Sequence, residues 1–122
     1  MKIVILKNDL YGSADRWIKS CQKFDIPFTL VDLTKDEWFD SIRIEEPDLL
    51  LVCPPAVNDI LKRMYDEKIE LIFAKGYKLY PQLHEIKLHE NKRYLSYWLK
   101  VNDIPHAPTH VFYSKGNALT FE

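Results

Sequence analysis

The sequence is poor in glycine and cysteine, and this scarcity excludes several kinds of site. Its only glycines are Gly12, Gly76 and Gly116, so no segment can form a phosphate-binding loop of the G-x-G-x-x-G type. The two cysteines, Cys21 and Cys53, lie far apart and form neither a C-x-x-C pair nor a zinc-ligand spacing with a histidine. This cysteine usage favours a reduced protein, and we expect a cytoplasmic location.

An excess of charge and a long apolar run are also missing. With 17 basic and 18 acidic residues the formal net charge is -1, so the chain has no overall basic field for nucleic acid or an anionic membrane. No apolar run approaches the roughly 20 residues of a membrane-spanning helix, and the N-terminal stretch reaches charged residues too early for a signal peptide. We therefore expect neither nucleic acid nor a membrane as a partner.

What the sequence does contain is an alternation of apolar runs and amphipathic segments. Continuous apolar runs predict strands that are covered on both faces, at residues 3–6, 28–33, 48–53 and 77–80. Apolar residues at helical spacing predict helices between these strands. The alternation predicts the α/β class: a Rossmann-like, doubly wound parallel sheet with helices on both faces and right-handed crossovers.

Local signals place the ends of these helices. Ser13 is a good N-cap for the first helix, and Thr34 with Glu37 fits a T-x-x-E capping box for the second. Gly76 is a plausible C-cap for a third helix that extends to about Lys75. A competing hypothesis makes residues 70–74 a separate strand.

The apolar positions of the same helices predict which side chains point inward. In the first helix these are Ala14, Trp17, Ile18, Cys21 and Phe24. In the second helix they are Trp38 and Ile42, and in the third they are Val57, Ile60, Leu61, Met64 and Tyr65.

The last third of the sequence differs in character. We expect a polar, irregular connection at 83–89, a helix at 90–103 and a strand at 109–113. Leu95, Trp98 and Leu99, together with Asn102, would share one side of that helix. The tail, with Ala118, Leu119 and Phe121, then begins another helix.

Ligands of open α/β sheets bind at the carboxyl ends of the strands, so the first loop is a candidate site. Tyr11, Gly12, Ser13 and Arg16 are candidates for binding the carboxylate or phosphate of a substrate. The competing interpretation is a glycine-aided turn with a serine N-cap and a solvated arginine. Cys53, at the end of the third strand, fits a small buried hydrophobe better than a nucleophile because no base lies near it in sequence.

The segment Asn91-Lys92-Arg93 opens the helix at 90–103 with two cations. The helix dipole disfavours cations at this end, so an anion nearby would explain the arrangement. Alternatively, Glu90 offsets the charge and Lys92 simply points into water. The four histidines, His84, His89, His106 and His110, have no ligand spacing and are expected to be solvated; no metal site is expected.

Two long stretches carry a resemblance to a known family. YPQLHEIKLHENKRYLSYWLKVNDIPHAPTHVFY resembles the beginning of the nucleotide-binding domain of ATP-grasp enzymes, with an [D/N]-K helix and an IP-x-P-T turn into a strand. YGSADRWIKSCQKFDIPFTLVDL is similar to the start of a subgroup of ATP-grasp carboxylate ligases. The resemblance implies a pre-ATP-grasp domain at 1–82 and the beginning of an ATP-grasp domain at 83–122.

The family resemblance implies a chemistry as well. ATP phosphorylates a small-molecule carboxylate, and an amine or similar nucleophile attacks the acyl phosphate. ATP and Mg²⁺ are the implied cofactors of the whole enzyme, and the basic residue of the [D/N]-K element, which contacts the phosphates, corresponds to Lys92.

The sequence departs from the family pattern, because it has no second lysine strand, glycine-rich phosphate loop or magnesium ligands after Glu122. We therefore expect a truncated front part that is inactive alone, binds no cofactor by itself, and pairs with the remainder of an ATP-grasp domain. An exposed C-terminal region could also form a homodimer. The alternative is a free-standing flavodoxin-like or response-regulator-like binding module, although Asp9 stands alone where a regulator needs an acidic cluster.

Overall fold

The computed structural model describes residues 1–8, 14–55 and 58–122. The chain divides into two compact units, a first unit, Met1–His89, and a second unit, Glu90–Glu122. The elements of the first unit are β1 (Ile3–Lys7), α1 (Asp15–Lys23), β2 (Phe28–Asp32), α2 (Trp38–Glu45), β3 (Leu49–Val52), α3 (Asp59–Ala74), β4 (Leu79–Tyr80) and α4 (Leu83–Leu88). The second unit contains α5 (Lys92–Val101) and α6 (Lys115–Leu119).

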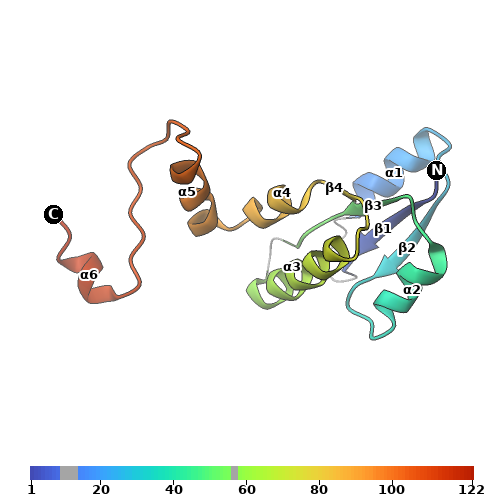
Figure 1. Ribbon diagram of the computed structural model, residues 1–122, viewed down its shortest axis with the longest axis horizontal. Coiled ribbons are helices and arrows are strands. Elements are labelled where there is room, and N and C mark those ends of the chain that lie inside the picture. Colours follow the sequence, from blue (N-terminus) through green and yellow to red (C-terminus); the bar gives the residue numbers. More distant parts are fainter. Residues whose placement is uncertain (9–13, 56–57) are drawn as a thin grey trace. The chain divides into compact units, whose positions relative to one another are not determined.

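The first unit is built on a parallel sheet with the strand order β2-β1-β3-β4. Figure 1 shows α1 on one face of this sheet and α2 and α3 on the other. The strand order reverses direction after β2, which places α1 on the face opposite to the later helices when crossovers are right-handed. The predicted α/β class with helices on both faces is confirmed.

Two apolar cores lie on the two faces of the sheet, because successive strand residues point to opposite sides. On the α2 and α3 face, Val4 and Leu6 of β1 pack with Tyr65, Ile69 and Ile72 of α3. The α1 face is smaller and contains the following residues: Ile3, Ile5, Ala14, Cys21, Leu51 and Cys53. The runs of β1 and β3 are therefore covered on both faces, as the continuous pattern predicted, whereas Leu30 of the edge strand β2 and Tyr80 of the edge strand β4 are exposed.

The first helix follows its predicted stripe except at its end. Ala14 and Cys21 are buried, and Trp17 and Ile18 pack against the same cluster. Phe24, predicted to point inward, is 66% exposed because the helix ends at Lys23 and Phe24 already belongs to the turn. The predicted N-cap Ser13 lies outside the described residues, as does Val57 of the third helix.

The second helix begins later than the T-x-x-E pattern predicted. α2 starts at Trp38, and its N-cap residue Glu37 makes no capping hydrogen bond. Thr34 does not cap the helix, because its hydroxyl donates to Asp32 Oδ1 at 2.7 Å. The predicted capping box is therefore wrong, whereas the inward position of Ile42 is confirmed.

The third helix runs without a break to Ala74, so the competing strand at 70–74 is wrong. Lys75 is its C-cap, and Gly76 follows with a φ of 92°, a left-handed conformation that suits glycine. The inward face differs from the predicted one, because Ile60 is 76% exposed. The predicted inward position of Tyr65 is confirmed, and the other buried positions of the helix are Lys62, Ile69 and Ile72.

The segment at 83–89 contradicts the prediction of an irregular connection, because it forms α4. The Gln82 N–H donates to Glu85 Oε2 at 2.7 Å, which satisfies a backbone group at the start of the helix. Ile86 is buried in the core beside α3. The segment is polar in composition, but one buried isoleucine and a favourable cap are sufficient for this short helix.

The fourth strand is shorter than predicted, since only Leu79 and Tyr80 pair with β3. α4 follows it and contacts α3, so α4 belongs to the first unit. The domain boundary that the family resemblance implies, between residues 82 and 83, stays a prediction. The division of the structure into compact units does not test it.

The second unit, which the structure describes throughout, contains helices but no strand. Asn91 caps α5 by accepting a hydrogen bond from the Tyr94 N–H at 3.0 Å. The predicted strand at 109–113 is wrong: a strand needs a partner, and no other part of this unit supplies one. The predicted last helix is confirmed as α6, which Ser114 caps.

Candidate functional site

The carboxyl edge of the sheet is where the sequence predicted a ligand, and the structure describes part of it. Tyr11, Gly12 and Ser13 lie outside the described residues. Arg16, the fourth predicted residue, is exposed on α1 and makes no ion pair with a carboxylate of the described residues.

The end of β2 contributes Asp32 to this edge. Its Oδ1 accepts two hydrogen bonds from Thr34, one from the N–H at 2.8 Å and one from the hydroxyl at 2.7 Å. Its Oδ2 is buried and has no hydrogen-bond partner among the described residues. Asp32 was not among the predicted site residues, although an acidic residue at a strand end was visible in the sequence.

The Tyr65 hydroxyl forms hydrogen bonds with the backbone at the ends of both β1 and β3. Its hydroxyl donates to the Leu6 carbonyl at 3.2 Å and accepts from the Cys53 N–H at 2.9 Å. The side chain is fully buried, and burial raises the pKa of the tyrosine hydroxyl far above its ordinary value. The hydroxyl therefore stays protonated and acts as a structural bridge.

Burial also determines the protonation state of Cys53. Burial raises the pKa of its thiol to about 12, although a hydrogen bond from Trp17 partly offsets this effect. A thiol with this pKa carries a negligible thiolate fraction near neutral pH and is a poor nucleophile. The interpretation of Cys53 as a small buried hydrophobe is thus the one that its surroundings favour.

Trp17 connects α1 to the same edge. Its indole N–H donates to the Val52 carbonyl at 3.3 Å, and its ring makes an edge contact with Tyr80, with centroids 5.7 Å apart. Tyr80 itself is exposed. These contacts fix α1 against β3 and β4 and so hold the carboxyl edge in place.

A buried cation on α3 was not foreseen from the sequence. The Lys62 ammonium contacts both carboxylate oxygens of Asp66, at 2.6 and 2.5 Å, and donates to the Ile86 carbonyl at 3.1 Å. Lys62 and Asp66 stand at i, i+4, so their ion pair was a visible signal, but the contact with α4 was not. The cation is fully used in joining α4 to α3.

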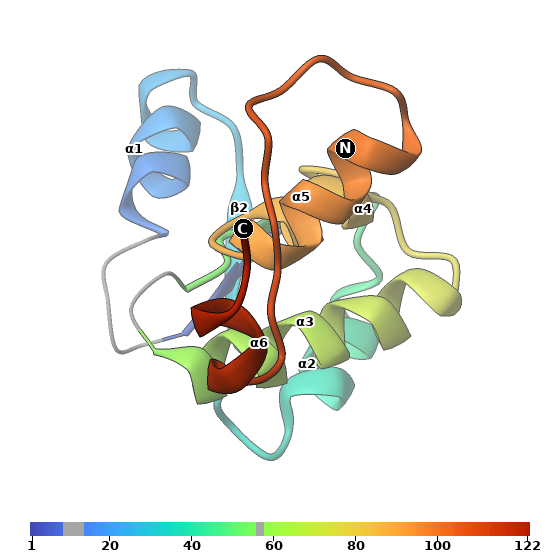
Figure 2. The same cartoon turned by 90° about the vertical axis from the view of Figure 1, so that its left-hand side faces the viewer.

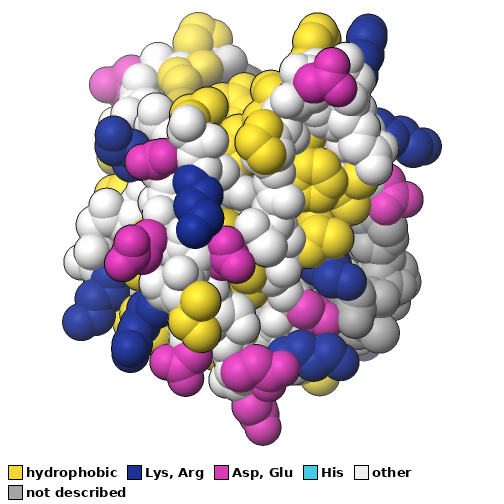
Figure 3. All heavy atoms as spheres, turned by 90° about the vertical axis from the view of Figure 1, so that its right-hand side faces the viewer, with side chains coloured by type: hydrophobic (Ala, Val, Ile, Leu, Met, Phe, Trp, Pro, Cys, Tyr) yellow, Lys and Arg dark blue, Asp and Glu magenta, His cyan; other side chains and the backbone are white. Residues whose placement is uncertain are grey.

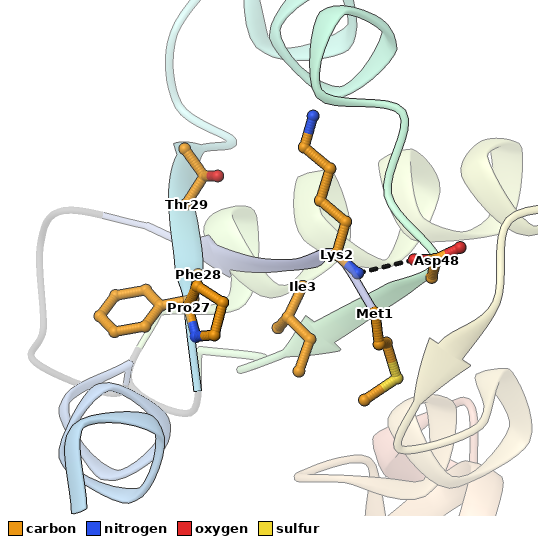
Figure 4. A pocket seen from close by; sticks show the side chains of 7 residues that line it. All are labelled: Met1, Lys2, Ile3, Pro27, Phe28, Thr29 and Asp48. Carbon is orange, nitrogen blue, oxygen red and sulfur yellow. Dashed lines mark hydrogen bonds between the residues drawn. The ribbon is translucent and has the colours of Figure 1, made fainter. Parts of the chain in front are cut away.

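A pocket of about 390 Å³ lies at the opposite, amino edge of the sheet (Figure 4). Its wall is mainly apolar, and its lining residues are Met1, Lys2, Ile3, Pro27, Phe28, Thr29 and Asp48. Asp48 already accepts a hydrogen bond from the Lys2 N–H at 2.6 Å, and the Lys2 ammonium lies 3.5 Å from Glu45. The charged side chains of Lys2 and Asp48 in this pocket are thus already paired.

Figure 3 shows a face of the molecule on which apolar side chains gather between scattered charges. Large exposed apolar residues of the first unit include Met1, Phe24 and Leu30. Such surface apolar residues are common on folded proteins and do not by themselves indicate a ligand.

Lys92, the predicted phosphate contact, is the first residue of α5 in the second unit. It is exposed and makes no ion pair with a described carboxylate, and the first turn of α5 contains no acidic residue. Glu90 stands before the helix with a φ of 53° and does not pair with the lysine. Glu90 thus makes no ion pair with Lys92, whereas the exposure of Lys92 agrees with the alternative that this lysine points into water.

The remainder of the second unit is open to solvent. Figure 2 shows α5 and α6 joined by a long extended segment. No residue from 90 to 122 is buried, and the apolar stripe of α5 is at best half-buried. Phe121 is 52% exposed, and its ring packs against the rings of His110 and Phe112, with centroids 4.4 and 5.2 Å away.

The described residues contain no group of three or more metal-ligating side chains. The four histidines are exposed, as expected. None of the helices formed by residues 14–55 and 58–122 is long and apolar enough to cross a membrane.

Comparison with known proteins adds no family. No family model matches this sequence, no curated protein is similar to it, and no solved structure matches it. The functional argument therefore depends on the chain's own residues.

Proposed function

We propose that this chain is the N-terminal part of an ATP-grasp carboxylate ligase, acting in the cytoplasm. In that enzyme ATP and Mg²⁺ would convert a small-molecule carboxylate into an acyl phosphate, which an amine or similar nucleophile would attack. The proposal rests on the resemblance of the two quoted stretches, which together span most of the sequence. It assigns residues 1–82 to the substrate side and residues 83–122 to the beginning of the nucleotide-binding domain.

The observation that supports this proposal best is the state of Lys92. A cation in the first turn of a helix is electrostatically unfavourable, and neither an acidic residue of that turn nor a described carboxylate compensates it. A phosphate group would compensate it. A lysine positioned beside transferring phosphates stabilises the charge that develops on them, which is the main protein contribution to phosphoryl transfer.

A second candidate function shares the same sheet. The order β2-β1-β3-β4 is also the order in which flavodoxin-like sheets begin, so a free-standing binding module is compatible with the first unit. The two candidates differ in the role of Lys92, which matters only for the ligase.

The test is titration of Mg-ATP into the protein encoded by the complete reading frame that contains this chain. Lys92→Ala should weaken ATP binding about ten- to a hundredfold, the range expected for a hydrogen bond between charged groups. Lys100→Ala is the matched control, because Lys100 is an exposed lysine in the last turn of the same helix. We expect it to bind ATP as the unmodified protein does.

Two results would contradict the ligase: no ATP binding by the unmodified protein, or equal losses in both variants. We also expect the 122-residue chain alone not to hydrolyse ATP, since one lysine without magnesium ligands cannot lower a barrier by the roughly 8 kcal/mol or more typical of enzymes. Magnesium-dependent turnover by the isolated chain would show that the site is complete without further residues.

A further inference from the structure

Helix α3 carries apolar residues on two opposite sides, and the core of the first unit covers one of them. Tyr65, Ile69 and Ile72 are buried in that core. Ile60 and Leu71, by contrast, are 76% and 63% exposed. Ile60 is about two and a half turns from Ile69 and so lies on the opposite side of the helix, whereas it is about three turns from Leu71 and shares a side with it.

Met64 extends this exposed side, because it is half-buried and lies one turn from Ile60. We call Ile60, Met64 and Leu71 the outer stripe of α3. The sequence pattern predicted Ile60 and Met64 to point inward, and the second apolar side explains this prediction. Single exposed apolar residues are common, but an aligned stripe directly opposite the buried side is typical of a helix that is covered on both sides.

Two charged residues beside the outer stripe indicate what covers it. Arg63 and Glu67 are both exposed and lie on the same side of α3 as the stripe. Glu67 makes no ion pair with a cation of the described residues. Arg63 lies 3.5 Å from Asp59 in a largely exposed pair, which contributes little to stability. Both charges are therefore available to a partner.

The outer stripe and these charges are self-complementary. When a second copy of α3 lies antiparallel across a two-fold axis near the middle of the helix, Ile60 of each copy meets Leu71 of the other. The same register brings Arg63 of each copy beside Glu67 of the other. Two apolar pairs and two pairs of opposite charge then form. A parallel arrangement would instead place equal charges opposite one another.

We propose that the outer stripe of α3 binds the outer stripe of a second copy of this chain, as an antiparallel helix pair with two-fold symmetry. One helix pair is a small interface, so the dimer should be weak and reversible, with a dissociation constant of about 10–100 µM. This surface differs from the C-terminal region that the sequence suggested for a homodimer. It does not involve Lys92, and it does not depend on the ligase proposal.

The first experiment is sedimentation equilibrium of the 122-residue chain at concentrations from about 5 to 500 µM. The mean mass should rise from that of a monomer towards that of a dimer. Ile60→Glu should raise the dissociation constant at least tenfold. The variant should still fold, which circular dichroism checks, because Ile60 is exposed and a glutamate in the first turn suits the helix dipole.

The matched control is Ile44→Glu, because Ile44 of α2 is 78% exposed and does not belong to α3. We expect this variant to associate as the unmodified chain does. A monomer at every concentration would overturn the proposal. So would a dimer that persists in Ile60→Glu, or equal losses in the two variants, since either result would assign the association to another surface.

The second experiment reverses the charges and tests the antiparallel register. Arg63→Glu alone and Glu67→Arg alone each place equal charges side by side in a homodimer, so each should weaken association at least several-fold. An equal mixture of these two variants pairs opposite charges again and should dimerise as the unmodified chain does. One chain that carries both changes should behave in the same way. Failure of both the mixture and the double variant to restore the dimer would overturn the proposed register.

Discussion

The two units of this chain differ in what they bury. The first unit packs apolar side chains on both faces of a parallel sheet, whereas the second unit, although fully described, buries no residue. Most of the free energy of folding in small proteins comes from apolar burial, so the first unit should carry almost all of it. The two units also differ in how their lysines are paired. Lys62 of the first unit forms an ion pair and a hydrogen bond, whereas Lys92 of the second unit makes no ion pair with a described carboxylate.

The largest effect on stability is expected when one buried side chain of the first unit is truncated, and this change tests the division of stability between the units. Ile69 of α3 is fully buried, so Ile69→Ala should lower the free energy of unfolding by about 2–5 kcal/mol. The control is Val101→Ala at the end of α5, where the side chain is 79% exposed and the change should stay within about 0.5 kcal/mol. Urea denaturation followed by circular dichroism measures both, and similar losses in the two variants would contradict a division of stability between the units.

A smaller effect is the dependence of stability on pH, which arises from two buried groups at the carboxyl edge of the first unit. Burial raises the pKa of the Cys53 thiol to about 12 from an ordinary value of 9.0, and it raises the pKa of Tyr65 as well. The folded state therefore keeps these protons at a pH at which the unfolded state loses them, and stability is full below about pH 9 and falls as the pH rises above it. Each group contributes a slope of up to about 1.4 kcal/mol per pH unit.

Unfolding measured by urea at several pH values between 8 and about 11 tests this expectation. Cys53→Ala removes one titrating group, so its stability should fall less steeply with pH than that of the unmodified chain. Cys21→Ala serves as the control, because Cys21 is a second buried cysteine of the same α1-face cluster but belongs to α1 and not to the end of β3. An identical pH dependence in the unmodified chain and Cys53→Ala would show that the thiol is not the group responsible.

Prediction from the sequence succeeded where interactions between residues close in sequence determine the structure. Strands such as β1 were predictable because a continuous apolar run needs two covered faces, and this requirement is local to the run. The helix through Ala74 was likewise predicted from its own spacing and from Gly76. Local signals therefore place the elements of the sheet.

The errors arose where a distant partner decides the outcome. The residues 109–113 have a strand-like composition but no neighbouring strand, and α4 forms in a polar segment because Ile86 finds a place in the core. At the candidate site, the bridge from Tyr65 to Leu6 joins residues 59 positions apart and leaves no mark in the sequence. The half-used carboxylate of Asp32 depends on how Thr34 turns, which a capping-box pattern predicted incorrectly.

The smallest expected effect on stability is at Lys92, and it sharpens the comparison between the units. Lys92 is exposed and makes no ion pair with a described carboxylate, so Lys92→Ala should change the free energy of unfolding by less than about 0.5 kcal/mol. Removing a cation from the first turn should, if anything, stabilise α5 slightly, because the helix dipole disfavours it there.

The matched change in the first unit is Lys62→Met, which leaves Asp66 without its partner and should cost several-fold more stability. Thermal melting of both variants of the 122-residue chain gives the comparison. A large loss in Lys92→Ala would mean that this lysine supports the fold, and the explanation of its position by an anionic ligand would then be wrong.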